Sequence, residues 1–358
     1  MIQSVKINNF MAISSLENKE ISPVTILVGK NDTCKTAVLK LLYSVVKSLE
    51  IYSIQNDVED NYALLSTIRD KLSTVFLSRN DFIYPLVKIG TEEFSFHLKI
   101  DAKKESDYSQ EISFFAKNGT WDTTGGNNKA RIMPEEIINS IFIPAKEVLS
   151  AFNDIQIMRE QFFGKGFDDT YLDLINMLKI PTRSEGIDSS FLKITDDLSA
   201  VLQGEIVQTV GAKDFFVFQR KGIKHDIHRT AEGVKKIGVL DTLIRNGRLR
   251  KGTMLFIDEP ENNLHPSAIR ALVNMLIKLS LNGVQIFIST HNYFVLKQFA
   301  VCAKRDNVDV ATWNMERDEH DNVVTMFSSM KDGILPDNDI VNESLSMFDD
   351  ELNVMYSV

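Results

Sequence analysis

One stretch near the N-terminus constrains the fold more than any other part of the chain. PVTILVG, residues 23–29, is an apolar run typical of a buried strand, and TAVLKLLYSVVKSL follows as an apolar-faced helix that we expect to start near Lys35. Between them, GKNDTCKT at residues 29–36 matches G-x-x-x-x-G-K-[ST] except at Cys34, where the pattern has its second glycine. A strand, a phosphate-binding loop and a helix in this order predict an α/β fold with a phosphate site.

The cysteine in the loop raises the question of whether the phosphate site binds nucleotide fully, weakly or not at all. If the loop needs φ > 0 at Cys34, a side chain there costs about 1–2 kcal/mol. Micromolar binding is worth about 8 kcal/mol, so the penalty weakens binding by a factor on the order of 10–30 and does not abolish it. We therefore expect a weakened site with slow hydrolysis. A thiol beside a lysine and a helix N-terminus also suggests a lowered pKa for Cys34, and with it a redox role.

Composition limits the class of protein. With 358 residues, 44% of them hydrophobic and 25% charged, the chain is long enough to bury a large core. No apolar run approaches the roughly 20 residues of a membrane span, and MIQSVKINNF lacks the pattern of a signal peptide. Cys34 and Cys302 are the only cysteines, so we expect no disulfide framework. These features predict a cytoplasmic protein that does not contact membranes.

Charge is unevenly distributed along the chain. The net charge of -9 argues against a protein that coats nucleic acid through its overall charge. The stretch from Lys213 to Lys251 nevertheless holds eleven basic residues against four acidic ones. A solvated helix face with exposed loops and a surface that contacts phosphates, including those of nucleic acid, are both compatible with this stretch.

Patterns of apolar residues divide the chain into a head and two lobes. Strands alternate with helices from about residue 205, which predicts a mostly parallel sheet covered on both faces. We predict a single discontinuous domain over residues 1–358. Its head comprises residues 1–50, 136–150 and 205–358, with an inserted α/β lobe at 51–135 and a helical lobe at 151–204.

Two carboxylates follow a buried strand in MLFIDEPENNLHP, residues 254–266. Asp258 and Glu259 come directly after four apolar residues, at the edge where ligands bind in open sheets. An aspartate there can hold Mg²⁺ through its water shell, and a glutamate beside it can orient or deprotonate an attacking water. A strand end that is acidic by chance is the simpler alternative.

A second buried strand, in VQIFISTHN at residues 284–292, ends in Ser-Thr-His. His291, at the tip of a strand next to that of Asp258, is placed to contact a γ-phosphate and sense its presence. A lone histidine after a strand is more often a polar residue that makes its hydrogen bonds within the fold and has no role in a site. Three strand ends with a phosphate loop, an acid pair and an imidazole together indicate phosphoryl-transfer chemistry.

A third segment, HRTAEGVKKIGVLDTLI at residues 228–244, begins an apolar-faced helix. Thr230 and Gly233 flank the start of this helix, whose free N–H groups and dipole suit a phosphate, including one bound to another copy of the chain. An ordinary N-cap by Thr230 is an equally good interpretation.

In order and spacing, GKNDTCKT, TAEGVKK, LFIDEPENNLHP and ISTHN resemble the Walker A, signature, Walker B with D-loop, and H-loop of ABC-type ATPases. Within that superfamily the chain is similar to the SMC-like and RecF-like branch, and most of all to the AAA-labelled ATPases of the overcoming-lysogenization-defect (OLD) type in bacterial antiphage systems such as Septu and retrons. NNF at 8–10 and IPAKEVLS at 143–150 also fit. The signature lacks the usual Ser-Gly pair, and no Q-loop glutamine is assignable.

The resemblance implies a fold, cofactors and a set of site residues. The fold is an ABC-type P-loop ATPase head with a mixed, mostly parallel sheet, and the cofactors are ATP and Mg²⁺. The ATP-binding loop comprises Gly29, Lys30, Asn31, Asp32, Thr33, Cys34, Lys35 and Thr36.

The resemblance also implies individual roles. Lys35 and Thr36 bind the β- and γ-phosphates and Mg²⁺, and Asp258 supports the metal. Glu259 is the catalytic base and His291 is the switch. In a head-to-head dimer, Thr230 and Gly233 complete the ATP site of the partner.

The leading functional hypothesis is an ATPase whose nucleotide-driven dimerisation repositions its lobes and controls an effector in antiphage defence. OLD-type relatives often carry a nuclease domain after the head, but here about 58 residues follow Ala300, and VATWNMER and VVTMFSS indicate a closing hairpin. We therefore expect a nuclease or toxin on a separate protein. The alternatives are a non-hydrolysing, ATP-gated scaffold or sensor and a RecF-like DNA-repair ATPase stimulated by DNA.

Overall fold

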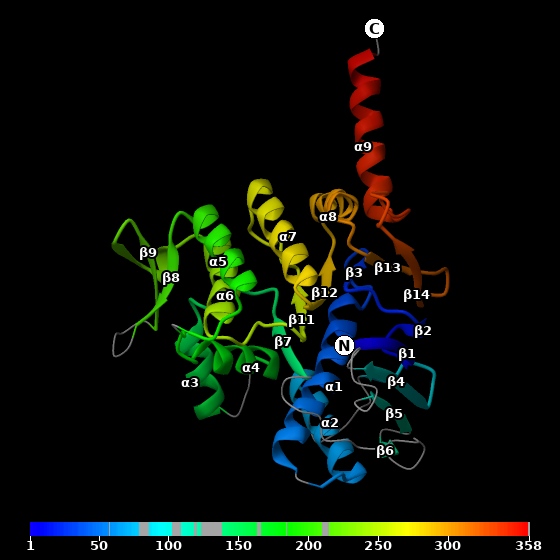
Figure 1. Ribbon diagram of the computed structural model, residues 1–358. Helices are drawn as coiled ribbons and strands as arrows, with labels where there is room; N and C mark the ends of the chain where they lie inside the picture. Colours follow the sequence, from blue (N-terminus) through cyan, green and yellow to red (C-terminus); the bar gives the residue numbers. More distant parts are fainter. Residues whose placement is uncertain are drawn as a thin grey trace.

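The computed structural model describes residues 1–56, 58–78, 86–101, 109–117, 120–122, 138–162, 166–183, 185–209 and 215–356. Within these residues, eleven strands form one mixed sheet in the order β6-β5-β4-β1-β2-β14-β13-β3-β12-β11-β7 (Figure 1). They are β1 (Ile2–Phe10), β2 (Ile13–Asn18), β3 (Val24–Val28), β4 (Glu93–Asp101), β5 (Ser109–Lys117), β6 (Thr120–Asp122), β7 (Asn139–Ile143), β11 (Thr253–Asp258), β12 (Gln285–Thr290), β13 (Val310–Arg317) and β14 (Val323–Ser329).

The remaining elements are a small second sheet and the helices. The small sheet has the order β10-β9-β8 and consists of β8 (Glu205–Gln208), β9 (Phe216–Arg220) and β10 (Ile223–Asp226). The helices are α1 (Lys35–Gln55), α2 (Asn61–Val75), α3 (Phe152–Phe162), α4 (Asp169–Leu178), α5 (Ser189–Leu202), the short 3-10 helix η2 (Ile227–Arg229), α6 (Glu232–Arg245), α7 (Pro266–Leu281), α8 (Tyr293–Asp306) and α9 (Asp339–Tyr356).

The parallel part of the large sheet contains the predicted strands. β13, β3, β12, β11 and β7 are parallel neighbours in that order. Every residue of β3, β7, β11 and β12 is buried, which explains why the middle of each segment is apolar in sequence. The expected α/β fold with a mixed sheet is confirmed, and the carboxyl ends of the parallel strands meet at one edge.

The other half of the sheet is antiparallel. β1 pairs with β2 and β4, and β4 pairs with β5, which in turn pairs with β6. The strands β4, β5 and β6 come from residues 51–135 and continue the sheet of the head through β1. The division of the chain into a head, an inserted lobe and a helical lobe stays a prediction.

Two hydrophobic clusters lie on opposite faces of the sheet. One packs α1 and α2 against the strands and includes Tyr43 and Phe256, whose ring centroids are 5.9 Å apart. The other includes α6, α7 and α8 and takes up Leu255 and Ile257. Successive residues of β11 therefore pack into different clusters, because side chains alternate between the two faces of a strand.

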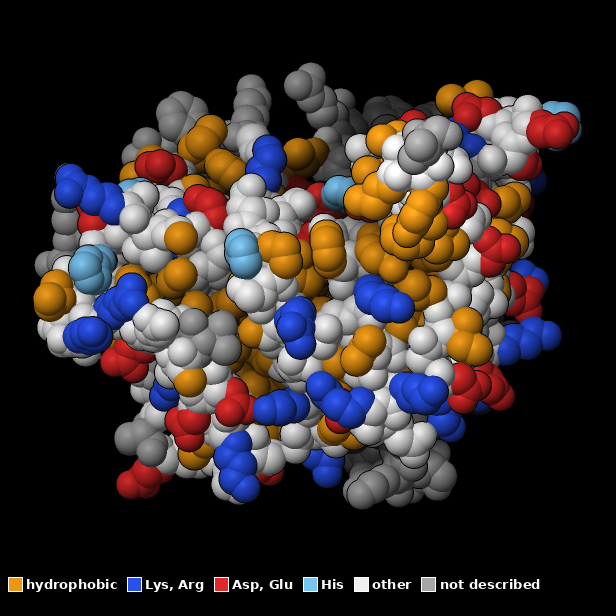
Figure 2. Space-filling view, turned by 90° about the horizontal axis from the view of Figure 1, so that it is seen from above, with side chains coloured by type: hydrophobic (Ala, Val, Ile, Leu, Met, Phe, Trp, Pro, Cys, Tyr) orange, Lys and Arg blue, Asp and Glu red, His pale blue; other side chains and the backbone are white. Residues whose placement is uncertain are grey.

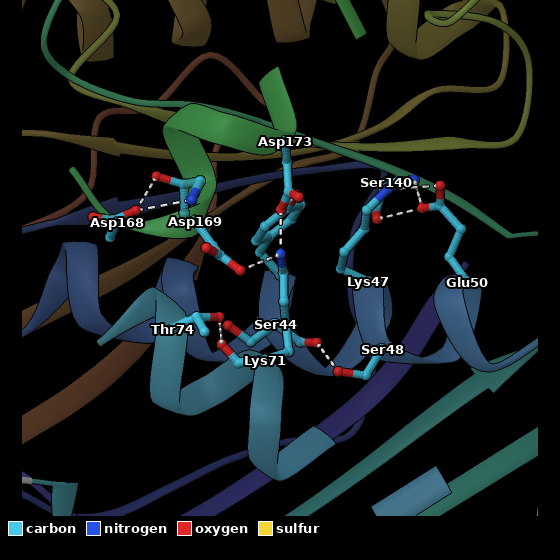
Figure 3. Close-up of polar contacts among 12 residues, drawn as sticks. Ser44, Lys47, Ser48, Glu50, Lys71, Thr74, Ser140, Asp168, Asp169 and Asp173 are labelled. Atoms are coloured by element: carbon cyan, nitrogen blue, oxygen red, sulfur yellow. Dashed lines mark hydrogen bonds and ion pairs between the residues drawn. The ribbon is translucent and has the colours of Figure 1, made fainter. Parts of the chain in front are cut away.

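Ion pairs connect α1 and α2 to α4. Figure 3 shows the Lys71 ammonium between Asp169 and Asp173, with N···O distances of 3.2 and 2.6 Å. On α1, Lys40 Nζ lies 2.6 Å from Asp168 Oδ2. Because the Lys71 side chain is buried, loss of its partners would leave an unpaired charge, so these contacts fix the position of α4 relative to α1.

The C-terminal part begins with the expected hairpin. VATWNMER and VVTMFSS form β13 and β14, which pair antiparallel from Ala311 opposite Ser329 to Arg317 opposite Val323. The helix α9 then projects away from the head (Figure 1). Among the described helices, none combines the length and the apolar character that crossing a membrane requires.

Candidate functional site

Three neighbouring strand ends form the candidate site. β3 pairs with β12 and β12 pairs with β11, all in parallel, with Val28 opposite Thr290 and Ser289 opposite Asp258. The phosphate loop, the acid pair and His291 therefore emerge from one edge of the sheet. This arrangement confirms the expectation that the strands of His291 and Asp258 are adjacent.

The loop folds tightly around its lysine. Lys35 Nζ donates to the carbonyl oxygens of Gly29 at 2.8 Å and Lys30 at 2.5 Å. Thr33 Oγ1 donates to the same Lys30 carbonyl at 2.9 Å. A Cβ at Gly29 would collide with the backbone carbonyl of Met315, so this position accepts only glycine. Burial lowers the pKa of Lys35, which the nearby carboxylates partly oppose.

Cys34 has φ 64° and ψ 13°, the left-handed conformation that glycine adopts without strain. Cys34 therefore has the positive φ that we assumed when we estimated the free-energy cost of a side chain at this position. The side chain is partly buried against the cluster that contains α1. Burial raises the pKa of the Cys34 thiol, so the expectation of a lowered pKa was wrong: desolvation outweighs the attraction of Lys35 and Arg317.

Substitutions at Cys34 test the backbone strain. We expect Cys34→Val to lower the free energy of unfolding by about 1–3 kcal/mol, because a β-branched residue is strongly disfavoured at positive φ. Cys34→Gly removes the strain at the expense of chain entropy, so it should leave stability nearly unchanged. Urea unfolding measures both effects. Equal stability of the two variants would contradict the strain argument.

A hydroxyl and a carboxylate meet beside the loop. Thr36 Oγ1 donates to Asp258 Oδ1 at 2.7 Å, and Ser289 Oγ donates to the same oxygen. Asp258 is buried, and burial raises its pKa despite these two hydrogen bonds. Oxygen donors from a hydroxyl and a carboxylate are what Mg²⁺ prefers, so the donor set fits this ion. Ser289 was not predicted, although it belongs to the polar end of ISTHN.

Glu259 is held in an unusual backbone conformation. Its φ of 44° is left-handed, and its N–H donates to the backbone and side-chain oxygens of Ser289, both at 3.2 Å. Its carboxylate lies 3.1 Å from His291 Nδ1 and accepts a hydrogen bond from Asn262 at 2.7 Å. Strained residues concentrate where a side chain must be aimed. Here the strain places the Glu259 carboxylate beside the imidazole.

A third carboxylate, Glu261, was missed by the sequence reasoning. It is 5% exposed, and its Oε1 accepts a 2.6 Å hydrogen bond from Thr290. Thr290 in turn accepts the N–H of Asn292, so Glu261 connects the loop after β11 to the segment that carries His291. Its other oxygen has no hydrogen-bond partner, and burial raises its pKa. The only sequence signal is a second glutamate in DEPEN.

Glu261 predicts a specific pH dependence. Its raised pKa means that the folded protein favours the protonated form, so its contribution to stability is complete below about pH 4.5 and declines as pH rises through the folded pKa. We expect Glu261→Gln to unfold at higher urea at neutral pH, by on the order of 1 kcal/mol, and to lose this pH dependence. Glu319→Gln, at an exposed position, is the control. A stability curve unchanged by Glu261→Gln would contradict the assignment.

A pocket of about 370 Å³ opens over the loop. It is lined by Met11, Asn31, Asp32, Thr33, Cys34, Lys35, Thr36, Ala37, Lys40, Phe76 and Glu259. Lys40 lies one helical turn after Thr36 and adds a second cation to this pocket. Met11 and Phe76 give it an apolar wall. Spacing along α1 could have indicated Lys40, but nothing in the sequence pointed to Met11 or Phe76.

Residues after β12 also reach the loop. Arg317 on β13 pairs with Asp32 Oδ2 at 2.8 Å and donates to the Asp32 carbonyl. Lys30 Nζ lies 2.9 Å from Asp339 Oδ2, at the first residue of α9. The loop is therefore attached to the hairpin and to the start of the C-terminal helix.

Thr230 and Gly233 lie apart from this pocket, outside its set of lining residues. Thr230 does not cap α6: its hydroxyl donates to the Asp226 carbonyl at 3.0 Å, and the N-cap is Ala231, which makes no side-chain capping bond. The interpretation of Thr230 as an ordinary N-cap was therefore wrong. A Cβ at Gly233 would come within 2.5 Å of Leu264, so α6 packs closely on the loop after β11.

The basic stretch divides into two parts, and its first residue, Lys213, lies outside the described residues. Lys235 is buried between Glu147 and Glu232, and Lys236 Nζ donates to the Glu259 carbonyl at 3.1 Å. Lys235 and Lys236 therefore make ion pairs and a hydrogen bond within the head. Four of the exposed cations of the stretch lie earlier, on and after the β9–β10 hairpin, and Lys251 at its end is also exposed.

Comparisons with known proteins agree with the motifs. Residues 24–297 match the family model described as "AAA domain, putative AbiEii toxin, Type IV TA system". The chain is 26% identical over 339 residues to the Old nuclease of Escherichia phage P2, an alignment that covers 82% of this chain and 57% of that protein. The chain thus spans little more than half the length of this relative. The resemblance to OLD-type ATPases is confirmed.

Solved structures of SMC heads are also similar. The SMC head domain from Thermotoga maritima has a TM-score of 0.49 at 12% identity, covering 92% of this chain and 98% of that one. The SmcHead bound to the C-winged helix domain of ScpA has a TM-score of 0.47 at 13% identity, with coverages of 92% and 97%.

Proposed function

We propose that this chain, which belongs to the AAA domain family described as putative AbiEii toxin of type IV toxin–antitoxin systems, binds ATP with Mg²⁺ and hydrolyses it. The observation that carries the proposal is the 2.7 Å hydrogen bond between Thr36 and Asp258 beside the buried Lys35. A hydroxyl, a carboxylate and an ammonium are the groups that hold a triphosphate and its cation in P-loop enzymes.

Each residue of the site has a definite task in this proposal. Lys35 binds the β- and γ-phosphate oxygens, and Thr36 and Asp258 are the residues that would hold Mg²⁺. Bound Mg²⁺ supplies charge neutralisation on the transferring phosphate. Glu259 orients a water and accepts its proton, and His291, 3.1 Å from that carboxylate, contacts the γ-phosphate and fixes the glutamate. The strained backbone of Glu259 aims its side chain for this step.

We further propose that ATP joins two copies of the chain head to head. The N-terminus of α6 lacks a side-chain cap, and the N–H groups of Val234 and Lys235 donate to the Ala231 carbonyl, so those of Glu232 and Gly233 are the ones available to a phosphate on a second copy. Thr230 and Gly233 would then complete the partner's site. The support is the order of the motifs along the chain, which resembles that of ABC-type ATPases.

The biological role that we propose is control of a separate effector, a nuclease or a toxin, in bacterial antiphage defence. The support is the relationship to the Old nuclease and the description of the family. Contacts from Lys40 to Asp168 and from Tyr43 to Asp173 offer a route from the nucleotide helix α1 to the helices at residues 151–204.

ADP release by purified protein, with and without its co-purifying partners, tests this function. We expect Mg²⁺-dependent release that Lys35→Ala abolishes, with Lys19→Ala, an exposed lysine elsewhere, as the matched control. Binding without any release in either preparation would favour the non-hydrolysing scaffold. A rate raised by DNA would favour the repair ATPase, with the exposed cations near β10 as its contact surface.

A further inference from the structure

The helix α9 exposes an apolar stripe. Val341 is the one buried residue of α9, and Leu345, Phe348, Leu352 and Met355 continue from it at intervals of four and three residues. Phe348 is 55% exposed and Met355 is 63% exposed. In Figure 2, hydrophobic side chains gather around the end of this helix, which points toward the viewer. A stripe of this spacing is the kind that packs against another element.

Charge restricts what can cover this stripe. Residues 339–356 contain five acidic residues and no lysine or arginine; the acidic residues are Asp339, Glu343, Asp349, Asp350 and Glu351. Asp339 pairs with Lys30, so two copies of α9 packed on each other would bring the other eight carboxylates together with no cation from either helix, which is unfavourable. The element that covers α9 must therefore combine apolar side chains with positive charge.

The chain carries such an element at the far end of the head. The hairpin of β9 and β10, with η2 after it, exposes Arg220, Lys221, Lys224 and Arg229. Ile223, 62% exposed, lies among these cations, and all four residues of β10 are exposed at the edge of the small sheet. Figure 1 shows that this sheet and α9 lie at opposite ends of the head, so α9 cannot reach the hairpin of its own chain.

We propose that α9 of one copy packs on the β9–β10 hairpin of a second copy. This inference rests on the proposed head-to-head dimer. There, Thr230 of one copy faces the phosphate loop of the other, and η2 and β10 come directly before Thr230 in the chain. α9 starts beside the same loop, because Asp339 pairs with Lys30. The hairpin of one copy therefore meets α9 of the other, once on each side of the two-fold axis.

Charge exchange tests the contact in the full-length chain. One variant carries Asp349→Lys and Asp350→Lys, a second carries Lys221→Glu and Lys224→Glu, and a third carries all four changes. All four positions are exposed, so the fold should tolerate them. Sedimentation velocity with ATP and Mg²⁺ should show dimerisation weakened about tenfold in each two-site variant and largely restored in the four-site variant. Glu20→Lys, at a distant exposed position, is the control.

Calorimetry with ATP on the same variants separates this inference from the proposed function. Retained ATP binding, with lost and restored dimerisation, supports the contact; ATP should bind somewhat less tightly to the copies that stay separate. Normal dimerisation of the two-site variants, a four-site variant no better than they are, or a wild-type chain that stays monomeric would overturn it. Variants that dimerise normally but lose a co-purifying protein would assign α9 to a separate partner, and would also overturn it.

Discussion

Glu259→Gln stops ATP hydrolysis while the protein still binds ATP. The amide keeps the size of the side chain and its hydrogen bond with Asn262, but it cannot accept a proton from water. General-base catalysis contributes a factor of about 10²–10⁴, so we expect turnover to fall by roughly that factor. Because bound ATP then persists, the dimer should accumulate. ADP release and sedimentation velocity measure the two effects.

The control for this prediction is Glu319→Gln, which removes an exposed carboxylate from the turn between β13 and β14. It should hydrolyse ATP at the rate of the unmodified protein. If Glu259→Gln retained its turnover, Glu259 would not be the base, and the neighbouring carboxylate Glu261 would be the next candidate.

Asp258→Asn should remove the dependence of ATP binding on Mg²⁺. Asparagine keeps an oxygen that can accept the hydrogen bonds from Thr36 and Ser289, but it lacks the negative charge that attracts the cation. Loss of a group that holds a metal through its outer shell typically costs 10- to 100-fold in affinity, and we expect a decrease of about that size in the affinity for ATP with Mg²⁺. Calorimetry with Mg²⁺ and with EDTA measures the difference.

Stability distinguishes this effect from misfolding. Because burial raises the pKa of Asp258, a neutral side chain suits this position in the folded protein, and the variant should melt no lower than the unmodified chain. Ser289→Ala is the control: it removes one hydrogen bond to Asp258 and keeps the charge, so binding should still depend on Mg²⁺. Asp258→Asn with full Mg²⁺ dependence would show that the cation is held elsewhere.

The sequence predicted the parts of the site that local patterns define. Apolar runs that end in Gly29, Asp258 and Thr290 located three strand ends, and parallel pairing placed them together. Whether Cys34 is strained depended on its φ, which no residue pattern reports. Its pKa was misjudged because the sequence shows the neighbouring lysine but not the burial of the thiol.

Long-range contacts were beyond the sequence reasoning. Asp168 meets Lys40 across 128 positions of chain, and Arg317 meets Asp32 across 285, so no periodicity connects them. Glu261 was missed because a glutamate in a polar loop gives no sign that it will be buried. Helix α9 was not predicted from the sequence, although its apolar residues recur at intervals of three and four.

The most direct test of the central claim is a calorimetric titration of ATP with Mg²⁺ into the full-length chain. We expect saturable binding at one site per chain, weakened by EDTA and abolished by Lys35→Ala but not by Lys19→Ala. Absence of binding heat from the unmodified chain, alone and with its co-purifying partners, or equal binding by Lys35→Ala, would contradict a triphosphate site at the ends of β3, β11 and β12.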